Sequence, residues 1–152
     1  MYTFVLFTHV IFAMVFFGLP FTFGRWYRLC SDHDAILRET LRTLRLFVFV
    51  HLNFCGLMVM ATGLWMSFRG HHWGAGIWLK GALLLVVLSL LNLNLYLGPA
   101  LNAQWRSLRR GDMDNPRERR RSNAGMRRRI AVFSAAHHSL ITLAVLLMIL
   151  KI

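Results

Sequence analysis

Four histidines lie inside long apolar stretches of the chain, namely His9, His51, His137 and His138. An ionisable side chain at the centre of a bilayer costs a few kcal/mol, so such residues usually face the interior of a helix bundle and mark a functional site. A neutral imidazole is a common axial ligand of heme iron and also suits copper. We therefore take these four residues as the candidate cofactor and metal ligands.

Helical geometry places three of the four histidines at a similar depth. At a rise of 1.5 Å per residue, His51 lies roughly 8 Å from the start of its apolar stretch, and His137 and His138 roughly 10–12 Å from the start of theirs. The two adjacent histidines point about 100° apart around a helix, so only one of them can face His51. Asn92 and Asn94 reach a comparable level in another stretch. The pattern predicts an inner polar layer in which His51 and one partner ligate a b-type heme.

A second polar layer is expected near the opposite surface. His9 lies about 10 Å from the start of the first apolar stretch, and Lys80 approaches from the start of the third. The apolar stretches contain no Asp or Glu, so acid–base chemistry within them would have to use His or Lys. At the rim of the inner layer, Arg45 and Arg127 are the expected partners of heme propionates, which need cations.

Four membrane-spanning helices are needed to position these residues. A helix crosses the bilayer with about 20 mostly apolar residues, and four stretches qualify, at about 2–23, 46–68, 78–101 and 130–150. Of the 152 residues, 57% are hydrophobic and only 16% are charged, whereas about a quarter are charged in soluble proteins. We expect one all-α domain over residues 1–152, a transmembrane four-helix bundle with up-down topology.

The distribution of positive charge predicts the orientation in the membrane. Most of the 18 Lys and Arg residues lie in the first and third connections, and cytoplasmic loops concentrate such residues. We expect a multi-pass protein of a bacterial-type inner (plasma) membrane, with both termini outside and the basic loops cytoplasmic. Those loops would attract anionic lipid. Nucleic acid is not expected as a partner, because the basic run at 117–129 has no aromatic side chain on which bases could stack.

Two segments between the apolar stretches have patterns of their own. Residues 31–45 begin with an N-cap candidate, Ser31 or Asp32, and continue with apolar residues at helical spacing. This pattern predicts a helix that runs into the second span. Residues 111–125 are polar, contain Pro116 and have glycine at both ends, which predicts a mobile loop.

Three classes of function are compatible with these features. The chain has no hydrolase, P-loop or C-x-x-C motif, which leaves redox chemistry with a bound cofactor open. Because of the histidines at a similar depth, the leading hypothesis is a heme-b-binding membrane protein. It would take part in electron transfer or in oxidation of a membrane-soluble substrate such as a quinol, the reduced form of a quinone, or a porphyrin. The second class is transport of copper or another soft metal through an interior lined by His and Met. The third is a non-catalytic accessory subunit of a larger membrane complex, in which the polar residues only join helices. In any of these classes the chain could form a homo-oligomer.

Short motifs in all four apolar stretches resemble one membrane protein family. The first stretch reads THVIFAMVFFGLPF, with His9 followed nine residues later by Gly18 and Leu19. The second ends in MVMATGLWM, the third begins WLKGALLLVVL with Lys80, and the fourth ends in LLMILK. These motifs resemble the HemJ-type protoporphyrinogen oxidases and the wider copper-resistance D (CopD-like) family.

The resemblance implies a four-helix membrane bundle that binds heme b, with His9 as a ligand and Lys80 as its functional partner. Lys80 is therefore the candidate catalytic residue that the resemblance implies. The fourth stretch departs from the family pattern. HemJ-type proteins resemble one another there in an Asn-Glu-x-Pro segment, whereas this chain has Ser-Ala-Ala-His-His at 134–138. The resemblance therefore favours heme binding over porphyrinogen oxidation itself.

Overall fold

The computed structural model describes residues 1–30, 34–69, 77–110 and 116–150, which are helical almost throughout and include no strand. Within these ranges, the side chains at 19–21, 24, 28, 34, 110 and 116–123 lie outside the description. The elements are α1 (Tyr2–Cys30), α2 (Asp34–Leu46), η1 (Phe47–Leu52), α3 (Asn53–Arg69), α4 (Ile77–Asn92), η3 (Leu93–Leu97), α5 (Gly98–Arg110) and α6 (Pro116–Leu150). The π-helical segments η1 and η3 join α2 to α3 and α4 to α5 without a break in the helix.

Three helical stretches are long and apolar enough to cross a membrane: Ala35–Arg69, Ile77–Arg109 and Ala124–Leu150. Helix α1 contributes a shorter apolar stretch, Tyr2–Gly18. Helices satisfy all their internal backbone hydrogen bonds, which is what a segment in lipid requires. The all-helical class with membrane-length helices is therefore confirmed. The number of crossings and the side on which the termini lie stay predictions.

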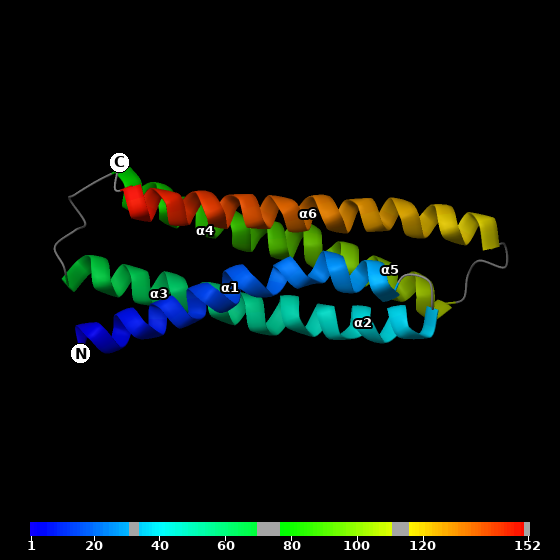
Figure 1. Ribbon diagram of the computed structural model, residues 1–152, viewed down its shortest axis with the longest axis horizontal. Helices are drawn as coiled ribbons and strands as arrows, with labels where there is room; N and C mark the ends of the chain where they lie inside the picture. Colours follow the sequence, from blue (N-terminus) through cyan, green and yellow to red (C-terminus); the bar gives the residue numbers. More distant parts are fainter. Residues whose placement is uncertain (31–33, 70–76, 111–115, 151–152) are drawn as a thin grey trace.

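The helices associate as two pairs, α1 with α3 and α4 with α6 (Figure 1). Helix α1 also packs on α6 and joins the pairs, and α2 packs on α5 at the far end of the molecule. The start of α1 and the end of α6 lie at the same end of the bundle, where the two pairs are well separated in Figure 1.

The hydrophobic core is most completely buried where α2 and η1 meet α5 and η3. Leu37, Leu41 and Leu44 of α2 are at most 1% exposed, and their spacing continues the stripe into the buried residues of η1. This confirms the helix predicted over residues 31–45 from Asp34 onward. Its N-cap candidates, Ser31 and Asp32, lie outside the described residues.

The mobile loop predicted over residues 111–125 is wrong for its second part. Helix α6 begins at Pro116 and is helical through Gly125. Proline is favoured in the first turn of a helix, where its missing N–H has no partner to lose. The Arg and Glu residues that follow are good helix formers. Pro116 therefore starts the helix instead of breaking one, and residues 111–115 lie outside the described residues.

Candidate functional site

A narrow apolar cleft of ≈40 Å³ lies at the seam between the two helix pairs. The pair α1–α3 contributes His9 and Met60 to its lining, and the pair α4–α6 contributes Lys80 and Met148. The remaining lining is almost entirely aliphatic. His9 and Lys80, the two residues expected to share an outer polar layer, thus line the same cleft.

Hydrogen bonds around His9 determine which of its ring nitrogens carries the proton. The Nδ1 atom lies 2.9 Å from the hydroxyl oxygen of Thr62. That hydroxyl donates its single proton to the backbone carbonyl of Met58 at 2.6 Å, so its oxygen can only accept from His9. We therefore assign the proton to Nδ1, which leaves a lone pair on Nε2. A histidine that binds a metal typically has this arrangement, in which its other ring N–H donates to a fixed acceptor.

Gly63 allows α1 to approach α3 closely at this point. A Cβ atom at position 63 would lie 3.3 Å from Cε1 of His9, a separation that real Cβ contacts seldom reach. The glycine of the A-T-G-L segment therefore makes room for the imidazole, one residue after the threonine that orients it.

Lys80 lies in the first turn of α4 and is exposed. Its apolar stem can lie along the cleft while the ammonium reaches the membrane surface, as long basic side chains do near helix ends. In this position the ammonium can pair with an anionic group at the mouth of the cleft, or carry a proton there.

His137 is fully buried, and both of its ring nitrogens are used within the bundle. Nδ1 lies 2.5 Å from the Ser89 hydroxyl, and Nε2 lies 3.3 Å from the Phe16 carbonyl. Because a carbonyl only accepts, Nε2 is the donor and Nδ1 accepts from Ser89. The imidazole thus joins α6 to α4 and α1, and neither nitrogen is available to a metal in this arrangement.

The other two inner histidines have different surroundings. His51 is exposed and packs against the ring of Phe47 one turn away, with ring centroids 4.8 Å apart. His138 is half-buried, and its Nδ1 lies 2.6 Å from the Ser134 carbonyl. An exposed His51 and an enclosed His137 do not present two imidazoles to one iron. In this arrangement His137 is not free to ligate a heme with His51, and ligation at this level by His51 with His138 stays a prediction.

The amides at the inner level join helices to each other. The side chains of Asn53 and Asn94 donate to each other, at 3.1 and 2.7 Å, at the point where η1 lies beside η3. Asn92 donates to the Phe133 carbonyl at 2.8 Å. Among the described residues, no group of three or more His, Cys, Asp or Glu side chains could hold a metal ion.

The two arginines expected at heme propionates lie away from the cleft. Arg45 is half-buried, with its guanidinium over the ring of Trp105 at 4.4 Å, and Arg127 is exposed. Arg45 precedes Val59, a residue of the cleft, by roughly 20 Å along one continuous helix. If a heme occupies the outer cleft, Lys80 is better placed than Arg45 to pair with its propionates.

Sequence reasoning did not single out the hydroxyl groups that orient the histidines. Thr62 and Ser89 each occur in a strongly apolar helix, where a hydroxyl needs a partner, and this is the only signal they give. Comparisons with known proteins add no further assignment. The chain matches no protein-family model, and no curated protein or solved structure matches it significantly. The resemblance to HemJ-type and CopD-like proteins therefore rests on the short motifs alone.

Proposed function

We propose that the outer cleft binds heme b with His9 as an axial ligand. The protein would then take part in electron transfer or in oxidation of a membrane-soluble substrate, a quinol or a porphyrin. The observation that carries this proposal is the hydrogen bond from His9 to Thr62, which leaves the Nε2 lone pair for a metal. Lys80 on the same cleft supplies a cation for a propionate or for an anionic substrate.

The proposal includes the arrangement in the membrane. We infer four crossings, made by α1, α2–η1–α3, α4–η3–α5 and α6, in a bacterial-type inner membrane. The arginine-rich end of the bundle would be cytoplasmic, as the positive-inside rule predicts. His9 and Lys80 would then lie in the half of the bilayer that faces away from the cytoplasm.

The volume of the cleft is the main obstacle to heme binding. Sites for large ligands occupy about 300–1,000 Å³, whereas this cleft has ≈40 Å³. A heme would have to separate the two pairs at their seam, where α3 and α4 contact each other much less than the helices within each pair do. The donor set fits a heme, since it combines an oriented imidazole, an apolar wall and a cation. Bound there, heme iron would supply one-electron chemistry.

The experiment compares two single-histidine variants of the purified protein. His9→Ala should lose the heme absorbance, because it removes the oriented ligand. His51→Ala should keep it, since His51 is exposed and packs only against Phe47 in the described contacts. Loss of heme in His51→Ala with retention in His9→Ala would transfer the site to the inner layer and refute the proposal.

Soft-metal binding is the second candidate, and a specific observation favours it. The cleft brings one imidazole together with two thioethers, His9 with Met60 and Met148, a donor set that suits Cu(I). A single ion also needs far less space than a porphyrin. This alternative predicts copper and no heme bands in the purified protein, and a lower copper content in Met60→Leu and Met148→Leu.

A further inference from the structure

A second, larger hollow lies near the α2–α5 end of the molecule, far from the His9 cleft. It is a groove of ≈700 Å³ between the α2–η1 helix and α5. Four of its residues are arginines, namely Arg38, Arg42, Arg45 and Arg109. Glu39, Leu46, Phe49 and Trp105 complete the lining. We call it the arginine groove.

Two guanidinium groups in the arginine groove share one aromatic ring. Arg45 lies over Trp105 at 4.4 Å and Arg109 at 5.3 Å. A cation gains about 0.5–2 kcal/mol from such a ring, but the ring does not neutralise the charge. The Nε atom of Arg45 is buried, and no described residue accepts a hydrogen bond from it. The groove thus holds two neighbouring positive charges with no carboxylate paired to either among the described ion pairs.

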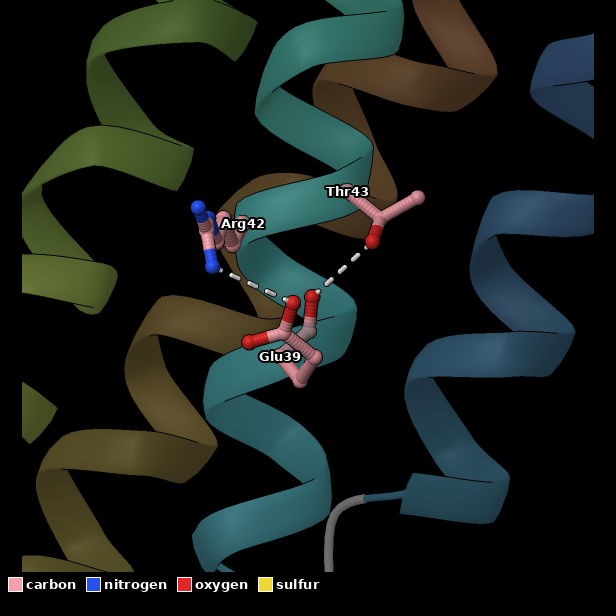
Figure 2. Close-up of polar contacts among 3 residues, drawn as sticks. All are labelled: Glu39, Arg42 and Thr43. Atoms are coloured by element: carbon pink, nitrogen blue, oxygen red, sulfur yellow. Dashed lines mark hydrogen bonds and ion pairs between the residues drawn. The ribbon is translucent and has the colours of Figure 1, made fainter.

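The single carboxylate in the groove is already engaged. Glu39 lies 3.5 Å from a terminal nitrogen of Arg42, and both side chains are well exposed (Figure 2). In the same view, Thr43 donates to the backbone carbonyl of Glu39 and leaves the carboxylate to Arg42. Arg38 donates to the Leu108 carbonyl at 3.1 Å, which ties α2 to α5. Arg45 and Arg109 are therefore the cations available to an anion.

The groove changes from charged to apolar along its length. Arg38, Arg42 and Arg45 follow one another at helical spacing, and Leu46 and Phe49 continue the same stripe toward the more apolar part of the helix. Leu46 is 57% exposed and Phe49 is 40% exposed. A ligand that fits this lining has an anionic head and an apolar tail.

We propose that the arginine groove binds an anionic phospholipid, with its phosphate at Arg45 and Arg109 and an acyl chain along Leu46 and Phe49. Guanidinium groups bind phosphate oxygens through paired, charge-assisted hydrogen bonds. Basic pockets at the membrane boundary bind anionic headgroups in this way. The proposal does not depend on what occupies the His9 cleft.

The test uses native mass spectrometry of the 152-residue chain released from detergent. The protein is titrated with phosphatidylglycerol or with phosphatidylcholine of the same acyl chains. Phosphatidylglycerol should bind more tightly. Arg45→Gln should weaken its binding about tenfold, the scale of one lost charge-assisted contact. Arg129→Gln is the matched control, because Arg129 is an exposed arginine of α6 outside the groove, and it should change the affinity less than twofold.

Glu39→Gln provides a test in the opposite direction. This substitution removes the carboxylate and frees Arg42, so it should tighten phosphatidylglycerol binding. If Arg45→Gln does not fold, the Glu39→Gln variant tests the lipid-binding proposal in its place. Equal binding of the two lipids would overturn the proposal. An equal loss in Arg45→Gln and Arg129→Gln would do the same, as would unchanged affinity in Glu39→Gln. Complete displacement of the lipid by millimolar inorganic phosphate would identify a free-phosphate site instead and would also overturn it.

Discussion

His9 and His137 differ in whether a ring nitrogen remains for a ligand, and their hydrogen bonds explain the difference. His137 is closed on both sides, by Ser89 and by the Phe16 carbonyl. His9 has its Nδ1 proton directed to Thr62, which leaves Nε2 with a lone pair. Sequence reasoning identified both residues by type and depth alone. It could not rank them, because the deciding partners lie 48 and 53 residues away.

Thr62 should control how well His9 binds a ligand. Thr62→Val removes the acceptor for the Nδ1 proton, so the ring loses its fixed tautomer and orientation. Such partners are worth about 10- to 100-fold in affinity at metal sites, and we expect a loss of that size in heme affinity, measured by titration of the apoprotein. Thr62→Ser keeps the hydroxyl and should bind normally. Equal affinities in the Val and Ser variants would show that Thr62 does not orient His9.

Tyr27 should make stability depend on pH at the alkaline end. It lies in the last part of α1, beyond the predicted span, is 3% exposed and accepts a hydrogen bond from Gln104. Burial raises the pKa of Tyr27 above its usual value, although Gln104 and the Arg127 charge act against this. The folded state therefore favours the neutral phenol. Its contribution is complete below about pH 10 and is lost as the pH rises through the folded pKa.

We therefore expect the detergent-solubilised protein to unfold at lower temperature at pH 11 than at pH 9, followed by circular dichroism. Tyr27→Phe cannot ionise and should show a smaller difference between the two pH values. An identical difference in the wild type and in Tyr27→Phe would assign the effect to other groups.

At the scale of elements, hydropathy predicted the helices better than their ends and irregularities. Apolar stretches and the stripe through Leu37, Leu41 and Leu44 were enough to predict the membrane-length helices and the helix before them. The π-helical segments η1 and η3 were not foreseen, since their sequences FVFVHL and LNLYL look like ordinary apolar helix. Asn53, which follows η1, and Asn94 of η3 form hydrogen bonds to each other. Only tertiary packing brings these two residues together.

Substitution of alanine for glycine at two positions, 98 and 125, tests the helix packing described above. A Cβ at Gly98 would lie 2.7 Å from the Phe49 ring and 3.0 Å from the Leu93 carbonyl, which belongs to the backbone and cannot rotate away. Gly98→Ala should therefore lower the unfolding free energy by about 1–3 kcal/mol. Gly125→Ala meets no atom within 4 Å and should raise it by up to about 1 kcal/mol through helix propensity. Thermal unfolding in detergent measures both, and a destabilising Gly125→Ala or a neutral Gly98→Ala would contradict the packing described.

For the whole molecule, the two-pair arrangement separates two sites. The His9 cleft lies at the seam near the chain ends, and the arginine groove lies toward the α2–α5 end. The arginines of α2 and α5 lie at the groove end of the molecule, and the side of the membrane that this end faces stays a prediction. The assignment of Arg45 to heme propionates assumed an inner heme and fails for an outer one, because helix length puts the residue too far away.

The proposed orientation predicts on which side of the membrane a reporter protein would lie when it is fused to the C-terminus or into the third connection. Alkaline phosphatase fused after residue 152 should be active, since it folds only outside the cytoplasm, where its disulfides form. A fusion within residues 111–115 should be inactive. The opposite pattern of activities would invert the topology and place the His9 cleft in the cytoplasmic half of the membrane.

The central claim is that the cleft at His9 holds a heme, and the most direct measurement is a reduced-minus-oxidised absorption spectrum with a heme-to-protein ratio. The sample is the detergent-purified protein expressed with ample heme. We predict a shifted Soret band, a sharp α band and about one heme per chain, because His9 is the one histidine among the residues that line the cleft. A spectrum without heme bands would contradict the account and leave soft-metal binding and a non-catalytic accessory subunit as the remaining hypotheses.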